Sequence, residues 1–494
     1  MIFMLCLFIC LAFAWWCLTT GQPRLPPGPR QLPLIGNLHQ ISRRRPWGTI
    51  KQWHKTYGPV VSARFGQRTF ILLGTHKAAK DLLHNRSRNY ATRPQSIVFG
   101  ESMTKGYLTA FLPYGNTFKT HRSLYKSLFN ARQSQKYQPF HSFESKRLLF
   151  ELLSTDDFFK CFDSYSYQLF FRLVYGKDAA RLDNGREVKL LKEISDGLMD
   201  GFTREINGII ESFPILHRLP PWLARWKDEG SEYFERGLEF CERNLAESLG
   251  SDSWNLAKET FLHGKAQGLS DRELAYFLAH IHTVSSHTTD KVLQVFVMAC
   301  VLYPAAVSTA QQELDQVTGS NRLPDFRDRS NLPYVNAFIH EVLRWRPVTP
   351  GGGPHAAIEQ DSYMGYDIPK GTIVVATNWA LDLNEDTHED PFVFRPERWI
   401  QNRELPLAAF GFGARACKGQ VFALDALFII ISRILWAYNI SATFTNGRKD
   451  YVDPWSFTHG LTSGPTPFGA SLKARTPKHQ LVVENEWKYT ADLG

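Results

Sequence analysis

One cysteine near the C-terminus of this 494-residue chain, Cys417, constrains the fold more than any other residue. It lies in the run Phe410-Gly411-Phe412-Gly413-Ala414-Arg415-Ala416-Cys417-Lys418-Gly419, and an apolar stretch with a helical pattern follows directly. Backbone N–H groups and the dipole at a helix N-terminus stabilise negative charge on sulfur. The run therefore predicts a thiolate presented on a glycine-shaped loop. The alternative is a buried free cysteine in a turn.

The same run resembles the haem-binding loop of the cytochrome P450 family, whose pattern is Phe-x-x-Gly-x-Arg-x-Cys-x-Gly. Every fixed position of that pattern is present. The resemblance implies that Cys417 is the axial ligand of the iron in haem b, and that Arg415 points at a haem propionate. It also assigns the cofactor-binding loop to Phe410, Gly411, Gly413 and Gly419.

Two further segments resemble the family in their order and spacing. The range Tyr334–Trp345 has the pattern of an amphipathic helix that carries Glu341 and Arg344 three positions apart, so their side chains share one face. Such a pair alone is most often a solvated ion pair. The range Phe394–Trp399 resembles the family's Pro-x-Arg segment. The resemblance implies that its Arg398 joins the helix pair in a buried cluster that holds the haem-binding loop.

A long helix is predicted between Ser270 and Tyr303. Ser270 and Glu273 form a capping-box pattern, and Pro304 ends the helix. The resemblance matches this helix to the one that crosses the distal face of the haem, where an Ala-Gly-x-Asp/Glu-Thr-Thr segment takes part in oxygen activation. Thr288 then occupies the position of the oxygen-facing threonine, whose hydroxyl can donate and accept hydrogen bonds.

Two residues of this helix depart from the family pattern, because Ser285 replaces the usual glycine and His287 replaces the usual carboxylate. An imidazole can carry protons at neutral pH, so His287 is a candidate proton relay. The departures equally suit chemistry that depends less on oxygen insertion. A metal site formed by His280, His282 and His287 is conceivable, although the three lack the i, i+4 spacing of helical metal ligands.

Further haem contacts are implied by resemblance alone. The range Pro113–Arg122 resembles the segment whose Trp-x-x-x-Arg residues contact the propionates, and it retains Arg122 but has Phe118 in place of the tryptophan. His121 is a substitute donor. His355 follows a proline where the family places a propionate-binding Arg or His. The alternative for His355 is a strand-end histidine bonded to backbone.

The N-terminus predicts a membrane anchor. Residues 2–18 carry no charge and are about long enough to cross a thin bilayer, and the first charged residues that follow are basic. We therefore expect a transmembrane anchor over residues 1–21, a proline-rich hinge over 22–36 and a haem-thiolate catalytic domain over 37–494. The catalytic domain is expected in the cytosol, on a single-pass anchor in the endoplasmic reticulum membrane. The alternative is a cleaved signal peptide ending near Ala12-Phe13-Ala14, which lacks a basic start.

The predicted fold class is mainly α, as in the cytochrome P450 fold, with a large helical domain and a small β-rich domain. Val60–Gly74 has the pattern of a β-hairpin around Gly66-Gln67, and Thr372–Ala376 that of a further strand. The three successive glycines at 351–353 are expected to leave space beside the haem. By analogy with the family, four aromatic residues are candidates for a wall of the substrate cavity, with ordinary core packing as the alternative for each. They are Phe99, Phe111, Phe202 and Phe213.

The amino-acid composition limits the classes of partner that this protein can bind. The seven cysteines include no Cys-x-x-Cys pair, which fits a reducing compartment and excludes a disulfide framework. The net charge of +9 is not gathered in one basic block, so no nucleic-acid binding is expected. A basic surface suits anionic lipid and an acidic electron donor, and an ordinary solvated surface is the alternative. The resemblance implies electrons from NADPH through a flavoprotein reductase, with cytochrome b5 as a possible second donor.

Three functions remain open from the sequence. The first is a haem-thiolate monooxygenase that uses O2 to hydroxylate or epoxidise a lipophilic small molecule, similar to filamentous-fungal family members of secondary metabolism. The second keeps the same haem fold but performs oxidative coupling, ring closure or dehydrogenation, as the residues Ser285 and His287 suggest. The third is a non-enzymatic haem-binding membrane protein.

Overall fold

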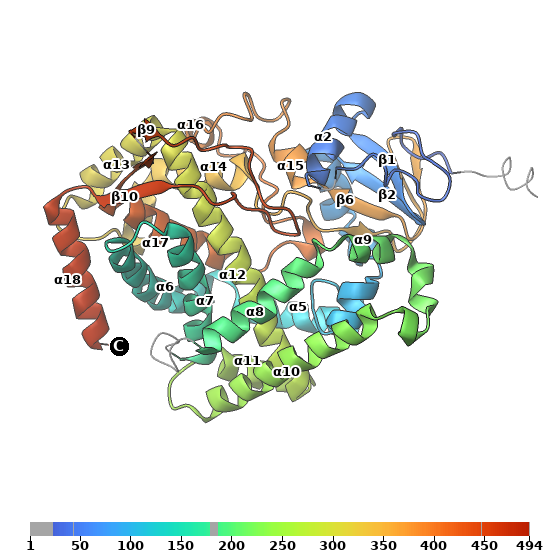
Figure 1. Cartoon of the computed structure of the whole chain (residues 1–494), viewed down its shortest axis with the longest axis horizontal. Coiled ribbons are helices and arrows are strands. Elements are labelled where there is room, and N and C mark those ends of the chain that lie inside the picture. The colour runs from blue at the N-terminus through green and yellow to red at the C-terminus, as the bar shows by residue number, and fades with distance from the viewer. Residues whose placement is uncertain (1–22, 43, 178–185, 446, 494) are drawn as a thin grey trace, which may run out of the picture.

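The computed structural model describes residues 23–42, 44–177, 186–445 and 447–493. Most of these residues lie in helices that form one large body, and a small β-sheet lies at one end of it, at the opposite end from the C-terminal helix α18 (Figure 1). The predicted division into a helical part and a β-rich part is confirmed. The predicted anchor at residues 1–21 lies outside the described residues.

The helices follow one another along the chain from α2 to α18. They are α2 (Pro46–Tyr57), α3 (His76–Ala79), α4 (Ser87–Tyr90), α5 (Asn116–Leu128), α6 (Ala131–Leu152), α7 (Phe158–Tyr175), α8 (Arg186–Gly201), α9 (Glu205–Ser212), α10 (Trp226–Gly250), α11 (Leu256–Ala266), α12 (Asp271–Leu302), α13 (Pro304–Thr318), α14 (Pro333–Trp345), α15 (Asn378–Asp382), α16 (Glu397–Gln401), α17 (Gln420–Ala437) and α18 (Pro477–Leu493). Shorter π or 3-10 turns connect them, namely η1 (Lys80–Asn85), η2 (Ile97–Met103), η4 (Pro214–Arg218), η5 (Pro221–Leu223), η6 (Phe326–Asn331) and η7 (Gly413–Arg415).

The main sheet has four strands in the order β1-β2-β6-β3. Strands β1 (Val60–Phe65) and β2 (Arg68–Leu73) form the predicted antiparallel hairpin, and Gly66 takes the positive φ of 59° that its turn requires. Strand β6 (Ile373–Ala376) adds parallel to β2, and β3 (His355–Ala356) pairs with β6. Smaller two-stranded sheets are formed by β4 (Asp361–Tyr363) with β5 (Tyr366–Ile368), β7 (Tyr438–Ala442) with β10 (Ala470–Ala474), and β8 (Phe444–Thr445) with β9 (Arg448–Lys449).

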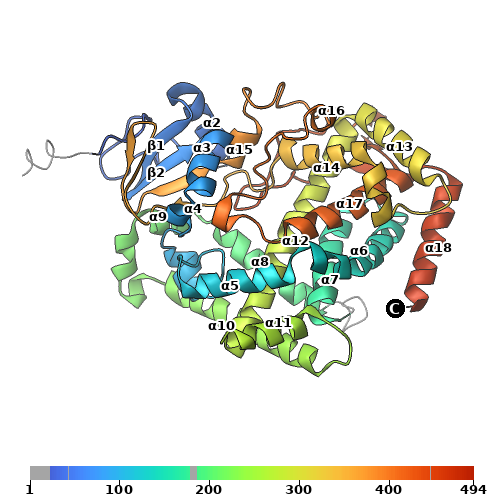
Figure 2. The same ribbon diagram turned by 180° about the vertical axis from the view of Figure 1, so that it is seen from behind.

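Helix α12 runs through the middle of the molecule, between α7 and α10 on one side and α14 and α17 on the other (Figures 1 and 2). The predicted capping box is present, since the Ser270 hydroxyl accepts from the Glu273 N–H at 3.2 Å and the Glu273 carboxylate accepts from the Ser270 N–H at 2.8 Å. The helix ends at Leu302, directly before the Tyr303-Pro304 stop. Its C-terminal half is buried in the main apolar core, which fixes the position of its middle turns.

The proline-rich segment after residue 22 lies against the sheet. The Ser62 hydroxyl and N–H, in β1, donate to the carbonyls of Pro26 and Pro27 at 2.7 and 3.1 Å. The Arg24 N–H donates to the Asp367 carboxylate at 2.8 Å, in β5. In the part of the chain that the structure describes, α17 is apolar and long enough to cross a membrane, but 78% of it is buried inside the protein. Helix α17 is therefore a core helix.

Several buried histidines make stability depend on pH. His141, in α6, has no exposed surface and no hydrogen-bond partner at either ring nitrogen, and burial lowers its pKa from 6.5 to about 3. Below about pH 6.5 this histidine is protonated in the unfolded chain but stays neutral in the folded protein. The free energy of unfolding is therefore highest above about pH 6.5 and falls by about 1.4 kcal/mol per pH unit below it, for one histidine. We expect His141→Phe to lose less thermal stability between pH 7 and about pH 5 than the parent protein does. Equal losses in calorimetry would contradict this assignment.

Candidate active site

The Cys417 loop is shaped by its glycines and by backbone hydrogen bonds. The Cys417 N–H donates to the Phe410 carbonyl at 2.8 Å, which closes the loop directly before α17. Gly413 has a φ of +56°, and a Cβ there would lie 2.0 Å from the Leu83 carbonyl oxygen. Gly411 also has a positive φ, of 68°. Glycine is therefore required at 413 by both backbone conformation and space.

The Cys417 side chain faces an internal cavity, where two effects act on its pKa in opposite directions. Burial raises the pKa of the Cys417 thiol above its usual value, while the Gly419 N–H acts in the opposite direction. Desolvation therefore opposes the thiolate that the loop and the helix N-terminus favour. A bound cation reverses this balance, since a coordinating thiol is deprotonated outright.

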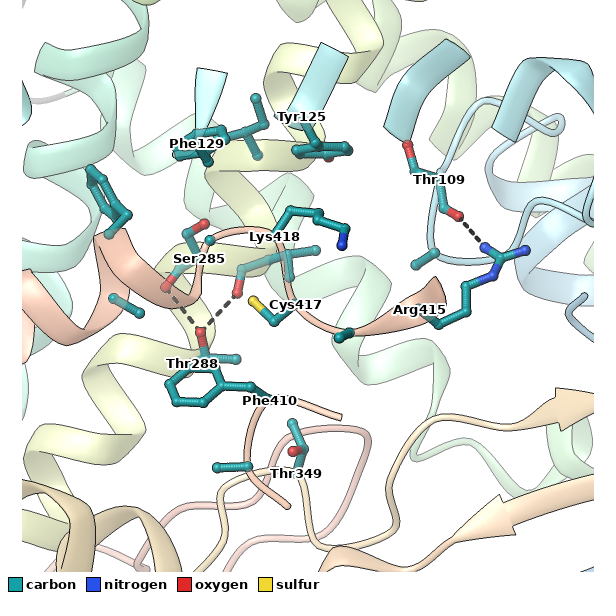
Figure 3. Close-up of a pocket in the computed structure, with 18 of the residues that line it drawn as sticks. Thr109, Tyr125, Phe129, Ser285, Thr288, Thr349, Phe410, Arg415, Cys417 and Lys418 are labelled. Carbon is teal, nitrogen blue, oxygen red and sulfur yellow. Dashed lines mark hydrogen bonds between the residues drawn. The ribbon is translucent and has the colours of Figure 1, made fainter. Parts of the chain in front are cut away.

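The cavity in front of Cys417 has a volume of about 410 Å³ and is lined mainly by apolar side chains. Figure 3 shows Cys417 facing it from the loop, and Ser285 and Thr288 facing it from α12. The Thr288 hydroxyl donates to the Val284 and Ser285 carbonyls of its own helix, at 3.1 and 3.3 Å. The volume lies in the range of cofactor and ligand pockets. The structure thus brings the predicted cysteine, serine and threonine to one cavity.

Three arginines at the cavity rim indicate an anionic group inside it. Arg93, Arg122 and Arg415 all line the cavity. Among the described residues none of them pairs with a carboxylate, and their guanidinium groups donate to the backbone carbonyls of Pro354, Ala414 and Ala91 respectively. Burial, together with the charges of the other two, lowers the pKa of Arg415 to about 9. Buried cations without an anion are costly, so the site fits a ligand with negatively charged groups at this rim.

Arg415 is held in place from several sides. Its guanidinium group donates to the carbonyls of Ala91, Thr109 and Leu112, at 2.6, 3.2 and 2.6 Å, and lies 3.5 Å from the centre of the Phe118 ring. Figure 3 shows the bond between Arg415 and Thr109. The phenylalanine that replaces the family's tryptophan therefore contacts the arginine through its ring face instead of donating an N–H. His121 bonds Thr109 at 2.8 Å and is not among the residues that line the cavity.

His287 is not among the residues that line the cavity of Cys417. Its Nε2 lies 3.3 Å from the Tyr167 hydroxyl and 3.5 Å from the Asp196 carboxylate. Burial lowers the pKa of His287 to about 4, so its imidazole is neutral at neutral pH. His287 and Thr288 both line a second cavity of about 190 Å³. Thr288 lines both cavities, so it is the residue that connects the cavity of His287 to the first cavity.

His355 and two glycines of the run at 351–353 line the second cavity as well. The Nδ1 of His355 bonds the Tyr90 carbonyl at 2.7 Å, and burial lowers the pKa of His355 to about 3, with Arg93 acting in the same direction. Gly352 has a φ of +67°, and a Cβ there would lie 2.0 Å from the Ala376 carbonyl oxygen. The strand-end alternative for His355 thus describes its backbone contact correctly, and its ring also borders a cavity.

The Glu341 carboxylate gathers the predicted charge cluster. Arg344 donates to both of its oxygens, at 2.7 and 2.8 Å, and Arg398 donates to one of them at 3.1 Å. The Arg395 N–H and the Trp399 indole also donate to Glu341, both at 2.9 Å. Glu341 and Arg344 have no exposed side-chain surface. Arg344 further donates to the carbonyls of residues 382 and 391, which ties α14 to the segment that precedes the Cys417 loop.

Three of the four aromatic candidates follow the core-packing alternative. Phe99, Phe111 and Phe202 do not line the cavity but stack on one another, with Phe99 and Phe202 ring centres 3.8 Å apart. They belong to a separate apolar cluster around η2, because aromatic surface is buried more completely against other rings there. Phe213 is also absent from the cavity lining. The conceivable metal site at His280, His282 and His287 does not form among the described residues, since His282 bonds the Tyr167 carbonyl.

Some residues of the site carry no signal in the sequence. Arg93 belongs to no motif, and only its place before Pro94 distinguishes it from a surface arginine. Tyr125 and Thr349 line the cavity from α5 and from the segment after α14. Their helical or loop patterns do not separate a cavity residue from a core residue.

Comparisons with known proteins agree with this geometry. The sequence model of the family described as cytochrome P450 matches residues 26–468. The chain is 44% identical over 463 residues to the cytochrome P450 monooxygenase FrzL of Cladobotryum sp., covering 94% of this chain and 90% of that protein. It is 39% identical over 465 residues to the cytochrome P450 monooxygenase peniB of Penicillium patulum, covering 94% and 87%. It is 37% identical over 481 residues to the echilunin cytochrome P450 monooxygenase of Aspergillus ruber, covering 96% and 89%.

A solved structure of a zebra fish cytochrome P450 with abiraterone is similar, with a TM-score of 0.74 and 22% identity, covering 87% of this chain and 100% of that one. At this identity the likeness shows the fold. The chain belongs to the cytochrome P450 family, and like its relatives it is a monooxygenase. The family implies a haem with a cysteine thiolate ligand, which supplies the electron-transfer and O2 chemistry that side chains lack. The thiol of Cys417 and the rim arginines, which no carboxylate of the described chain neutralises, fit a haem with its two propionates.

Proposed function

We propose that this enzyme inserts one oxygen atom of O2 into a lipophilic small molecule, by hydroxylation or epoxidation, in a fungal secondary-metabolite pathway. The observation that carries the proposal is the shared cavity of Cys417 and Thr288, which face it from the loop and from α12 (Figure 3). The fungal organisms of the relatives, and the name of the echilunin monooxygenase, support the metabolic setting.

In this proposal each site residue has a stated task. Cys417 ligates the haem iron. The propionate side is held by Arg122, Arg415 and His355, and the loop is shaped by Phe410, Gly411, Gly413 and Gly419. The Thr288 hydroxyl accepts a proton from the second cavity and donates one into the first, which its position at both cavities supports. Neutral His287 accepts and releases that proton in turn, and Ser285 adds a hydroxyl to the same wall.

We further propose that the enzyme works at the endoplasmic reticulum membrane. The uncharged run at residues 2–18, the proline-rich segment that follows and the net charge of +9 support a cytosolic domain held on anionic lipid. Electrons come from NADPH through a flavoprotein reductase, with cytochrome b5 as a second donor. The domain limits at residues 21 and 36 are part of this proposal.

Oxidative coupling or ring closure is the second candidate function. Ser285 lines the same cavity as Thr288, at a position where the family pattern has a glycine and so no side chain. His287 is neutral and bonds the Tyr167 hydroxyl, outside the first cavity. It is therefore a weak direct proton donor to that cavity. Both observations favour a reaction that needs fewer protons at the site.

Turnover with isotopically labelled O2 separates the two candidates. The full-length enzyme is combined with the reductase, NADPH and candidate polyketides or indole alkaloids, and products are analysed by mass spectrometry. Label in the product supports oxygen insertion. A coupled, cyclised or dehydrogenated product without label would replace the first proposal by the second.

Thr288→Val is expected to lower product formation by about a hundredfold, the usual contribution of a positioned proton donor, while NADPH consumption continues. Valine keeps the volume and removes the hydroxyl. Product and NADPH are measured in the same reaction. The matched control is Thr283→Val, because the Thr283 hydroxyl pairs with Ser195 at 3.0 Å and lines neither cavity. Equal effects of the two variants would show that Thr288 does not deliver protons.

A further inference from the structure

Three buried side chains outside the active site converge on one point. They are His76, the first residue of α3; Asp382, the last residue of α15; and His388, in the turn that follows α15. One ligand atom from each lies within 4.8 Å of the other two, and among the described residues this is the group that could hold a metal ion. Their distance in sequence means that only the fold brings them together.

The polar atoms of this group are largely without partners. Asp382 and His388 are 0% and 1% exposed. Neither ring nitrogen of His388 makes a hydrogen bond of normal geometry, and the Oδ2 of Asp382 has no partner either. The Oδ1 of Asp382 accepts from the Ala408 N–H at 2.9 Å and lies 3.2 Å from the Nε2 of His76. Unsatisfied buried groups at one point are costly unless something binds them.

The ligand set identifies the class of ion. Two imidazoles and one carboxylate suit zinc or another divalent transition metal, with water in the remaining position. Calcium and magnesium prefer sites made of oxygen atoms. The buried cation Arg344 directs its guanidinium group to Glu341 and to backbone carbonyls, so its charge is partly compensated. His76 keeps 10% of its side-chain surface exposed, which offers the ion a route in.

We propose that His76, Asp382 and His388 bind a divalent transition metal ion such as Zn²⁺, which serves as a structural clamp beside the Cys417 loop. The clamp joins α3 to the turn after α15, whose Asn384 also donates to the Gly74 carbonyl at 3.3 Å. Through Asp382 it reaches Ala408, two residues before the Cys417 loop begins. The His76 ring also lies near Phe412 of that loop, with ring centres 6.4 Å apart. The ion therefore takes no part in oxidation and instead steadies the segment that leads into the loop.

The test uses the full-length, haem-loaded enzyme and zinc chloride. Protein is incubated with zinc, excess metal is removed on a chelating resin, and zinc and haem iron are counted by mass spectrometry. We expect about one zinc per haem in the parent protein and at least a tenfold lower ratio in His388→Gln and His76→Gln. His263→Gln is the matched control, because His263 is exposed on α11, and it should retain the parent ratio.

X-ray absorption at the zinc edge of the parent protein gives the second readout. Scattering from two imidazoles and an oxygen, without sulfur, is the expected first shell. The proposal would be overturned if the parent protein retained less than about a tenth of a zinc per haem after passage over the resin. An ordered water would then be the occupant of the site. Equal zinc in parent and His388→Gln proteins would also overturn it. If both variants fail to fold, a first shell without imidazole in the parent protein decides against the site.

Discussion

Cys417→Ala is expected to lower oxygenation by more than about a thousandfold, equivalent to about 4 kcal/mol of lost transition-state stabilisation. The thiolate sulfur is the group that donates electron density to the haem iron, and no other cysteine of the described chain faces the cavity. Product formation is measured with NADPH, reductase and a substrate found in the labelling experiment. We expect the variant to lose both product formation and the red-shifted absorption band of thiolate-ligated haem.

The fold should survive this substitution. The Cys417 side chain faces the cavity, and its loop is closed by the Cys417 N–H, which alanine retains. The far-ultraviolet circular dichroism spectrum should therefore be unchanged. The matched control is Cys300→Ala, because Cys300 is fully buried in the core on α12 and lines neither cavity. Activity in Cys417→Ala comparable to that of Cys300→Ala would contradict the assignment.

Glu341→Gln is expected to cost about 3–5 kcal/mol of stability, the usual penalty for leaving a buried charge without its partner. The amide removes the charge that balances Arg344 and Arg398, and its NH2 group faces donors where the carboxylate accepted five hydrogen bonds. A loss of this size is a large part of the stability of an ordinary domain. We expect little soluble, haem-loaded protein and a large fall in the thermal midpoint.

The matched control for Glu341 is an exposed pair of the same type. Lys55 and Glu385 lie 2.9 Å apart, with side chains 51% and 56% exposed. Exposed pairs contribute little, so Glu385→Gln should leave the thermal midpoint almost unchanged. A small effect at Glu341, similar to that at Glu385, would show that the cluster does not hold the loop.

Local patterns were sufficient to predict several elements. The capping box at Ser270, the proline stop at 304 and the hairpin around Gly66 follow from backbone chemistry that acts within a few residues. The Glu341 cluster was found because spacing on one helix face and resemblance to a family pointed to the same residues. The fixed residues of the Cys417 run, together with the order and spacing of the other two motifs, were enough to predict the family.

Contacts between distant segments could not be predicted from the sequence. The stacking of Phe99 on Phe202 depends on how η2 meets the segment after α8, and the pattern of either segment alone is that of any buried aromatic. Arg93 reaches the cavity only because its segment pairs with β3 through the Thr92–Ala356 bridge. The burial of the Cys417 thiol, which raises its pKa, could not be predicted either, because burial has no local sequence pattern.

Ligation of the haem iron by the sulfur of Cys417, as a thiolate, underlies every proposal about the reaction. The most direct measurement is the absorption spectrum of the full-length protein, reduced and then exposed to carbon monoxide. A strongly red-shifted Soret band, which thiolate-ligated haem gives, is the predicted result. An unshifted band, as expected for a histidine-ligated haem, would contradict the assignment of Cys417.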